Sequence, residues 1–480
     1  MNGRMIARLL SKVLYISAVL LVLPLIAGLV YGESVVNFVV TIAATAAAGF
    51  VLSLFKPRSS ALTARDGFAT VGLSWVLLGL FGAIPFVISG DIPNYIDALF
   101  ETVSGLTTTG ASILPDVEAL SRGGLFWRSF THWIGGMGVL VFILAVVPMG
   151  DEHSMHIMRA EIPGPTVGKL VPRARKTARI LYVIYAGLTV AETVFLMLGG
   201  MSFYDALLHA FATAGTGGFS TRAASVAAFD SAYIEMVIAV FLVLFGMNFN
   251  LFYLCLIGHV REALKSEELH CYLGLIAFST AAIALGIYKM YGGVSTALRH
   301  AFFNTVTIVS TAGFGTEDFT LWPQYTQYII VILMFIGGCA GSTGGGLKLS
   351  RVMLLMKTAQ ADIVRLMHPR AVRRVQLDGK RVDESTTHAV YGFFFVYLLI
   401  IIVAGLLISV DGYDFTTNFT AALSCMSNIG PGLALVGPKG NFAIFSKFSE
   451  LVLTVVMLLG RLEIYPVVLL ASPSLWKKNG

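Results

Sequence analysis

Charged residues are scarce in this sequence. Lys, Arg, Asp and Glu together supply 12% of the 480 residues, which is about half the share found in a typical soluble domain. Apolar residues supply 56%, and the mean hydropathy is +0.80. This composition excludes an ordinary soluble domain and predicts an all-α, polytopic membrane protein with room for roughly ten spans of about 20 residues each.

Cysteine is also scarce, and catalytic motifs are missing. The cysteines lie far apart in or beside apolar segments, and we interpret them as packing residues, not as a disulfide or metal framework: Cys255, Cys271, Cys339 and Cys425. No H-E-x-x-H motif or other catalytic constellation is visible, so an enzyme is the least favoured class. The net charge of +6 does not indicate nucleic-acid binding, because basic residues in a membrane chain more often mark cytoplasmic loops.

Long apolar stretches alternate with short polar gaps. The stretches fall near 13–31, 36–55, 69–89, 125–149, 180–200, 233–258, 272–291, 325–347, 387–410 and 445–472. Basic residues gather in every second gap, most densely in 151–179 and 351–383, while several of the opposite loops are acidic. The positive-inside rule then predicts that both termini are cytoplasmic.

A half-length apolar segment followed by a glycine-rich turn recurs four times. The segments read IDALFETVSGL, FYDALLHAFATA, STALRHAFFNTVTIVS and DFTTNFTAALSCMS, and the turns read TTTGAS, GTGGFS, TAGFGT and NIGPGL. Each copy lies between two long spans, which indicates an internal repeat. The predicted division is two N-terminal helices (1–62), a first repeat (63–150), a cytoplasmic loop with a second repeat (151–264), a third repeat with its cytoplasmic loop (265–384), and a fourth repeat (385–480).

The turns have the chemistry of a cation filter. Irregular backbone at membrane depth is tolerated only where it is buried in protein or lines a cavity, so each half-length helix is predicted to be re-entrant. Its C-terminal carbonyls favour a cation, glycine lets carbonyls turn inward, and rings of backbone carbonyls select potassium. The alternative is that the glycines only let helices pack closely. The candidate filter residues, with potassium at Thr109 and the four glycines, are Thr109, Gly110, Gly217, Gly218, Ala312, Gly313, Ile429 and Gly430.

A second glycine-rich stretch, FIGGCAGSTGGGLKLSR, interrupts the span at 325–347. Six glycines within 337–346 would weaken a helix badly, so we expect an unwound segment that gates the pore. A phosphate-binding loop is disfavoured, because Leu347 separates Gly346 from Lys348 and no strand precedes the stretch. The candidate gating residues are Gly337, Gly338, Gly341, Ser342, Thr343, Gly344, Gly345, Gly346 and, from the last span, Arg461.

Three charged or titratable residues lie within apolar segments. An intramembrane arginine is costly, so Arg461 is expected either to touch the unwound segment or act as an electrostatic barrier, or else to form a structural pair or snorkel. Glu192 receives no role. His132 is interpreted as an interfacial residue.

These motifs resemble the TrkH/TrkG membrane subunits of bacterial Trk potassium uptake systems, in the Trk/Ktr/HKT superfamily. The likeness covers nearly the whole chain and rests on DALFETVSGLTTTGAS, WIGGMGVLVF, AEIPGPTVGKL, STAGFGTEDF, GGCAGSTGGGLK and SNIGPGL. It implies four M1–P–M2 potassium-channel-like repeats around one pore, preceded by two extra helices. Each filter loop would supply one glycine. Relatives with serine in the first loop tend to admit sodium, whereas this chain has Gly110.

The resemblance also implies a setting for the chain. It implies a homodimer in the bacterial inner membrane, surrounded by lipid, on a cytoplasmic ring of TrkA-type subunits that bind nucleotides. This chain has no nucleotide-binding domain of its own, and the ring is expected to dock on 151–179 and 351–383. Arg461 matches the arginine that faces the gating loop. No cofactor is expected apart from potassium in the filter.

Two transport mechanisms remain open from the sequence. One is a gated potassium-selective pore driven by the potassium gradient and the membrane potential. The other is a potassium symporter coupled to protons or sodium, since such carriers also use broken helices near the midplane.

Overall fold

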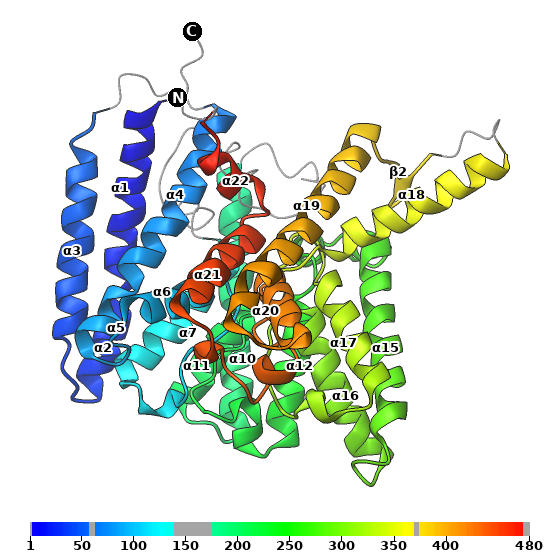
Figure 1. Cartoon of the computed structure of the whole chain (residues 1–480), viewed down its shortest axis with the longest axis horizontal. Helices are drawn as coiled ribbons and strands as arrows, with labels where there is room; N and C mark the ends of the chain where they lie inside the picture. The colour runs from blue at the N-terminus through cyan, green and yellow to red at the C-terminus, as the bar shows by residue number, and fades with distance from the viewer. Residues whose placement is uncertain (1, 57–62, 139–173, 369–373, 474–480) are drawn as a thin grey trace.

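The computed structural model describes residues 2–56, 63–138, 174–368 and 374–473 (Figure 1). The described part of the N-terminal third consists of α1 (Gly3–Leu20), α2 (Val22–Val30), α3 (Val36–Ser53), α4 (Ala64–Gly82), α5 (Ile84–Ser89), α6 (Tyr95–Leu106), the 3₁₀ turn η1 (Val117–Ala119) and α7 (Arg122–Gly136). The middle third consists of α10 (Ala174–Leu198), α11 (Phe203–Gly215), η2 (Ser225–Phe229), α12 (Ala232–Phe245), α13 (Phe249–Leu256), α14 (Val260–Ala263), α15 (Glu267–Ile287), α16 (Val294–Val309), η3 (Phe319–Leu321) and α17 (Gln324–Ile336).

The C-terminal part continues the helical pattern, with one small exception. Antiparallel strands of two residues each form a hairpin after α18, with Gln376 opposite Arg381. The elements are α18 (Leu349–Met367), β1 (Gln376–Leu377), β2 (Lys380–Arg381), α19 (Glu384–Ile408), η4 (Ser409–Asp411), α20 (Phe415–Ser427), η5 (Ala434–Val436), η6 (Phe442–Ile444), α21 (Lys447–Arg461) and α22 (Tyr465–Ala471).

Several of these helices are built to cross a membrane. Within the described residues, six helical segments are long and apolar enough to do so, and α12 with α13 would make a seventh if the bent pair is one span. Large apolar side chains on α19 are exposed, among them Phe395 at 67% and Leu406 at 70%. Exposing this apolar surface of α19 to water would cost free energy, whereas lipid chains can cover it. The predicted all-helical, multi-pass membrane protein is confirmed.

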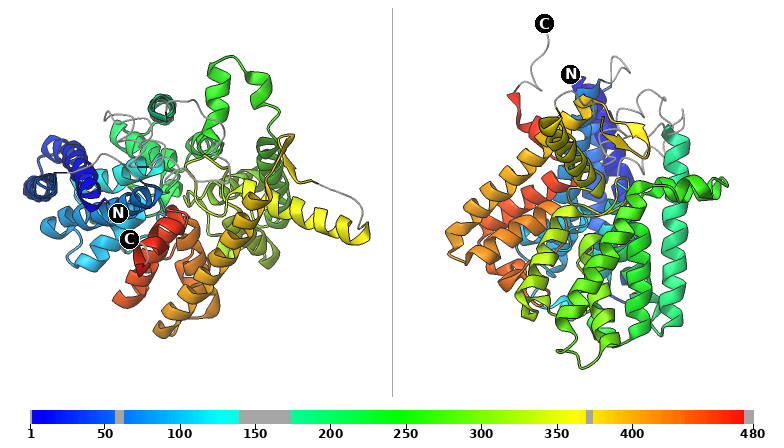
Figure 2. Two further views of the ribbon diagram at one scale, coloured as in Figure 1. Left: turned by 90° about the horizontal axis from the view of Figure 1, so that it is seen from above. Right: turned by 90° about the vertical axis from the view of Figure 1, so that its right-hand side faces the viewer.

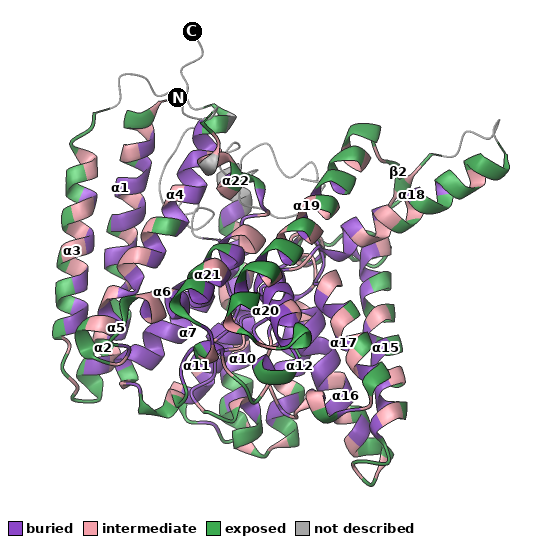
Figure 3. Cartoon of the chain, in the orientation of Figure 1, coloured by how far each residue is buried: buried purple, intermediate pink, exposed green. Residues whose placement is uncertain are grey.

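Four helices are too short to span a bilayer and lie inside the bundle. They are α6, α11, α16 and α20, each of 16 residues or fewer, against about 20 for a span. Buried residues concentrate where these helices meet in the middle of the molecule (Figure 3). The start of α1 and the end of α22 lie at the same end of the molecule (Figure 1).

Two predicted continuous spans are broken, so those predictions were wrong. The stretch 233–258 divides into α12 and α13, which meet at an angle of 86°. The break falls at Gly246, where an added Cβ would lie 2.2 Å from the Tyr272 hydroxyl, and at Asn248, whose side chain caps α13. The stretch 445–472 divides at Glu463 and Ile464, both with positive φ. Glycine and a capping side chain are common causes of such breaks.

The segment 351–383 is not the simple loop that the sequence predicted. It contains most of the 19-residue helix α18, which extends away from the body of the molecule (Figure 2, left, yellow), followed by the hairpin. The second half of the predicted span 125–149 lies largely outside the described residues. So do the boundary between the first two predicted repeats and most of the basic segment 151–179.

Candidate functional site: a four-loop ring and the segment beneath it

The four turns share one backbone conformation. Two residues before each paired glycine, a non-glycine residue adopts the left-handed region, and the glycine itself has a positive φ. Non-glycine residues rarely adopt this conformation, so a fourfold recurrence indicates a common design. The left-handed residues are Thr108, Thr216, Thr311 and Asn428 (φ 54°, 54°, 64° and 55°), followed by Gly110, Gly218, Gly313 and Gly430 (φ 77°, 77°, 75° and 101°).

The structure brings the four turns together into a closed ring. A Cβ atom added to any of the four glycines would meet the carbonyl oxygen that precedes the glycine of the next loop. These distances are 1.9 Å from Gly110 to Gly217 O, 2.0 Å from Gly218 to Ala312 O, 1.9 Å from Gly313 to Ile429 O, and 2.8 Å from Gly430 to Thr109 O. Only glycine fits at these contacts, and the eight residues selected from the sequence are the ones that make them.

A cavity of about 130 Å³ opens over the ring and is lined by all four glycines. None of the described residues that line it is an aspartate or a glutamate. The oxygen atoms available at the ring are therefore mainly backbone carbonyls. Neutral carbonyl oxygens can replace the water shell of a monovalent cation, whereas rings of carboxylates are typical of other cation pores.

The helices that lead into the ring add to its preference for cations. Each of α6, α11, α16 and α20 ends three or four residues before the glycine of its loop. The C-terminal carbonyls of a helix carry a partial negative charge, so four such ends directed at one site favour a cation there.

Side-chain hydrogen bonds tie the fourth loop to the first. The Asn428 amide donates to Thr109 Oγ1 and to Met457 O, at 3.0 Å each. The Gly430 carbonyl accepts from Ser424 Oγ at 2.7 Å. Sequence reasoning did not select Asn428. The signal was present, because asparagine occupies the position where the other three aligned turns have threonine.

The glycine-rich segment is non-helical and lies against the helix side of the ring. Gly345 N donates to Thr311 Oγ1 at 2.6 Å. Added Cβ atoms would lie 2.8 Å from Ser310 O at Gly344 and 2.2 Å from Ser427 O at Gly345. The segment therefore contacts the third and fourth loops directly beneath the ring, in the way expected of an unwound stretch between α17 and α18.

Hydrogen bonds fasten the first half of this segment to the break between α12 and α13. Cys339 N donates to Gly246 O at 3.0 Å, and Phe249 N donates to Gly341 O at 3.1 Å. Ala340 N donates to Glu268 Oε1 at 2.7 Å. These contacts satisfy backbone groups that would otherwise be costly to bury. Glu268 and the break were not anticipated, although Gly246 and Asn248 could have indicated it.

Two cationic side chains hold the second half of the segment. Arg461 donates to Thr343 O at 2.7 Å, and also to Gly135 O and Gly136 O at the end of α7, at 2.5 and 2.6 Å. The Lys348 ammonium, which is buried, donates to Gly344 O. Arg461 therefore touches the unwound segment, as expected, and it also forms the structural carbonyl contacts of the alternative interpretation. Lys348 was missed, having been considered only as a phosphate-loop residue.

The interpretation of His132 as interfacial was wrong. His132 is fully buried in α7, and its ring stacks on Phe219 with centroids 4.2 Å apart. An added Cβ at Gly217 would lie 1.8 Å from its Nδ1. Because α7 packs behind the second loop, the side chain lies against the ring instead of at a membrane surface. Glu192, which received no role, is also fully buried.

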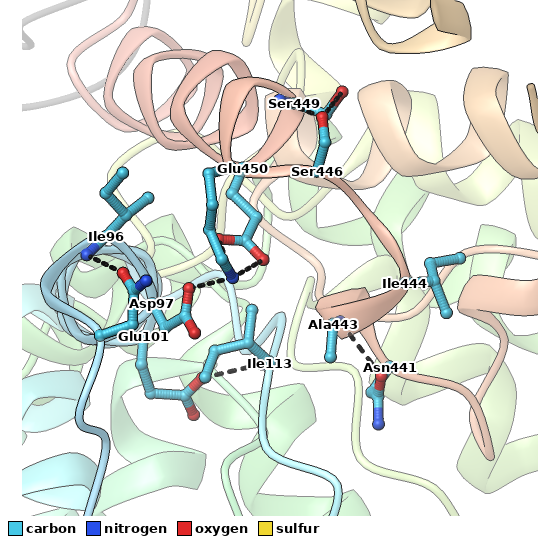
Figure 4. Close-up of polar contacts among 12 residues, drawn as sticks. Ile96, Asp97, Glu101, Ile113, Asn441, Ala443, Ile444, Ser446, Ser449 and Glu450 are labelled. Atoms are coloured by element: carbon cyan, nitrogen blue, oxygen red, sulfur yellow. Dashed lines mark hydrogen bonds and ion pairs between the residues drawn. The ribbon is translucent and has the colours of Figure 1, made fainter. Parts of the chain in front are cut away.

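An ion-pair group joins the first and last repeats at the outer rim. The Lys447 ammonium at the start of α21 lies 3.0 Å from a Glu450 carboxylate oxygen and also contacts Asp97 in the first turn of α6 (Figure 4). This group lies at the ends of the helices opposite the glycine-rich segment. It fastens α6 to α21 at the side of the molecule where the cavity opens.

Comparison with known proteins identifies the family. A family model described as "TrkH: Cation transport protein" matches residues 34–281 and 287–478. The chain belongs to the TrkH family of cation transport proteins. The resemblance seen in the sequence motifs is therefore confirmed, and the TrkH-family chain is a membrane transport protein, not an enzyme.

Full-length relatives support the same assignment. The chain is 37% identical over 486 residues to the Trk system potassium uptake protein TrkH of Salmonella typhimurium (strain LT2), covering 100% of both chains. It is 33% identical to the Trk system potassium uptake protein TrkG of Escherichia coli (strain K12), covering 99% of both. The crystal structure of the potassium transporter TrkH from Vibrio parahaemolyticus matches with a TM-score of 0.90 at 34% identity, over 99% of this chain and 100% of that one.

Proposed function

We propose that this TrkH-family chain carries potassium into the bacterial cell through a gated, potassium-selective pore formed by four M1–P–M2 repeats. The observation that carries the proposal is the closed ring of four loops, in which each glycine faces a carbonyl oxygen of the next loop. A ring of backbone carbonyls with no lining carboxylate suits potassium. Potassium would be held at Thr109 and the four loop glycines. The relatives named above are potassium uptake proteins, which supports the same cargo.

The glycine-rich segment is the proposed gate. It lies beneath the ring and is held by Arg461 and Lys348 through carbonyl contacts that could be exchanged for water. It includes the residues from Gly337 to Gly346 that the sequence analysis selected. Movement of this segment away from the third and fourth loops would open the path below the filter.

The proposed assembly is a homodimer in the bacterial inner membrane that is regulated by a cytoplasmic TrkA-type nucleotide-binding ring. The relatives are named as components of Trk systems, which supports a multi-subunit setting. The arm formed by α18 extends from the end of the molecule that carries both described termini (Figure 1). This arm and the segment 151–179 are the proposed docking regions.

The decisive experiment measures potassium and sodium flux into liposomes that hold the purified protein. We compare the wild type with Gly110→Ser, whose new Cβ would lie 1.9 Å from Gly217 O. Gly412→Ser is the matched control, because Gly412 has a similar φ of +80° but has no neighbouring atom within 4 Å. We expect the wild type to prefer potassium, Gly110→Ser to admit sodium, and Gly412→Ser to behave as the wild type. A folded Gly110→Ser protein with unchanged selectivity would show that the ring is not the filter.

The same liposomes distinguish a pore from a coupled symporter. A pore gives potassium flux that follows the electrochemical driving force for potassium alone. A symporter gives flux that also depends on a proton or sodium gradient. We expect no effect of an imposed pH or sodium gradient at constant membrane potential. A clear gradient dependence would favour the symporter.

A further inference from the structure

One buried ion pair lies beside the ring, and its arginine lines the cavity that opens over the ring. Arg128 Nε on α7 is 2.6 Å from Glu101 Oε1 on α6, and the side chains are only 3% and 0% exposed. Burying two charges costs desolvation that their attraction often fails to repay, so such a pair is weak grounds for assuming a stabilising role. What the two side chains hold is therefore more informative than the pair itself.

Glu101 holds the outgoing limb of the first loop, by which we mean the residues that follow the loop glycine. Its Oε1 accepts from Ser112 Oγ and its Oε2 accepts from Ile113 N, at 3.0 Å each (Figure 4 shows the contact with Ile113). Ser112 is two residues beyond the loop glycine, Gly110. The carboxylate thus fixes the position at which the chain leaves the ring.

Arg128 contacts the corresponding residues of the second loop, those that follow its glycine. It donates to Ser220 O at 3.1 Å, and its Cζ lies 3.4 Å from the centroid of the Phe219 ring. Phe219 and Ser220 directly follow the loop glycine, Gly218. His132, four residues after Arg128 on α7, stacks on the same phenyl ring. The phenyl ring is therefore held between two side chains of one helix, and the guanidinium joins both loops at equivalent positions.

At the equivalent position, the described side chains of the second and third repeats form a tie within one loop and no charged link to the next, and the fourth repeat has an alanine. Nine residues before the paired glycines stand Glu101, His209, Asn304 and Ala421. His209 Nε2 contacts Ser220 Oγ at 2.9 Å, and Asn304 donates to Thr316 Oγ1 at 3.4 Å, each on the outgoing limb of its own loop. Among the described residues, the first repeat is the one that places a carboxylate at this position, and Arg128 extends the tie to the second loop. Further out, the partly exposed Arg222 joins the same two loop regions by contacting Asp205 on α11 and Glu118 after the first loop.

We propose that Arg128, paired with Glu101, is a positioning residue that sets the spacing of the first and second loops and thereby the ion selectivity of the ring. The inference rests on the proposed function of the ring as a potassium filter. Selectivity by a carbonyl ring depends on where the oxygens lie and how far they can move. A brace that joins the first two loops therefore fixes the spacing between their carbonyl oxygens.

The test measures the ratio of potassium to sodium flux in liposomes for two variants. The double variant Glu101→Gln/Arg128→Gln removes both charges, so no unpaired charge stays buried. We expect the ratio to fall by about tenfold, the scale of coupling within one hydrogen-bonded network, at a melting temperature close to that of the wild type. Arg128→Lys keeps the charge but loses the planar fork, so we expect a smaller fall. If the double variant does not fold, the flux ratio of Arg128→Lys alone decides whether Arg128 has the positioning role.

The matched control is the double variant Glu235→Gln/Arg299→Gln. This pair joins the half-length helix α16 to the 14-residue helix α12, with Arg299 Nε 3.2 Å from Glu235 Oε2, and neither side chain forms a hydrogen bond or ion pair with the described residues of the four loops. Its flux ratio should be unchanged.

An unchanged ratio in both test variants, or a lower melting temperature at a wild-type ratio, would overturn the positioning role. If the wild type itself fails to prefer potassium, the proposed filter is what fails. If Gly110→Ser changes selectivity and these variants do not, only the present inference fails.

Discussion

At the residue scale, each loop glycine has two independent reasons to be glycine. The backbone φ at Gly110 is 77°, which a residue with a Cβ adopts at a cost, and the space where that Cβ would lie already holds Gly217 O. The first reason applies to many turns. The second is specific to a site where two backbones approach each other. A substitution here therefore strains the loop and displaces its neighbour together.

Arg461 is the residue whose removal should most directly release the gate. It donates to carbonyls on the glycine-rich segment and at the end of α7, and both sets lose a charged donor in Arg461→Gln. If this weakens the closed state by about 1.4 kcal/mol, the open population rises about tenfold. We expect potassium flux without a regulatory partner to rise to that degree. The control Arg365→Gln changes an exposed arginine on α18 that pairs with Asp362, and its flux should match the wild type. A fall in protein yield at unchanged flux would give Arg461 a structural role only.

Asp414 gives a prediction about pH. Its side chain caps α20, accepting from Thr417 N at 3.0 Å, and hydrogen bonds from the Thr417 hydroxyl and backbone hold the pKa of Asp414 below its usual value. The folded state therefore binds this proton more weakly than the unfolded state. The stability contributed by the charged cap is present above the unfolded pKa of about 3.9 and is lost as pH falls through the folded pKa.

Asp414→Ala should accordingly lower the free energy of unfolding by about 1 kcal/mol at pH 7. The difference from the wild type should shrink below about pH 4, where the wild-type cap also loses its charge. Denaturation in detergent at several pH values measures both effects. Asp414→Asn, which can still cap, should keep most of the stability at pH 7 without this pH dependence. A constant difference between Asp414→Ala and the wild type at every pH would contradict the assignment.

At the scale of elements, the glycine-rich segment, which is the proposed gate, is held by two sets of hydrogen bonds. Deleting Cys339 to Gly344 removes most contacts with the α12–α13 break and the Arg461 contact, so potassium flux without a partner should rise while the ion preference of the intact ring stays. A milder variant, Gly345→Ala, places a Cβ 2.2 Å from Ser427 O and should act in the same direction. Gly405→Ala, which meets no atom within 4 Å, is its control. Unchanged or lost flux in folded protein would contradict a gating role.

The sequence predicted those elements whose signal is local. The half-length helices end at hydroxyl- and glycine-rich turns, and their boundaries in the structure fall within a few residues of the predicted ones. The breaks at Gly246 and Glu463 were missed, because hydropathy is averaged over a window of residues. It does not detect a bend when the residues on both sides of the bend are apolar. His132 was misjudged because its neighbours come from another repeat. The Arg128–Glu101 link between the first two loops could not be predicted at all, since nothing in either segment shows that they lie side by side.

At the scale of the whole molecule, the repeats share an architecture but differ in detail. All four supply a left-handed residue and a glycine to one ring. Among the described residues, the third repeat carries the glycine-rich segment, and the first pairs its half-length helix with a buried arginine that reaches the second loop. The proposed pore therefore has four unequal quarters, and gating and selectivity would reside in different repeats.

That the four quarters belong to one continuous chain has a consequence for inheritance as well as for assembly. A ring of separate subunits dissociates on dilution. One defective subunit also inactivates every ring into which it assembles. Here the loops are held at a high effective concentration by the spans between them, so closing the ring is a unimolecular step that does not depend on expression level. A harmful change in one loop is confined to the molecules that carry it. In a cell that also makes the wild-type protein, such an allele should therefore be recessive. The same change in a homotetramer would be dominant, because mutant and wild-type subunits would mix in one ring.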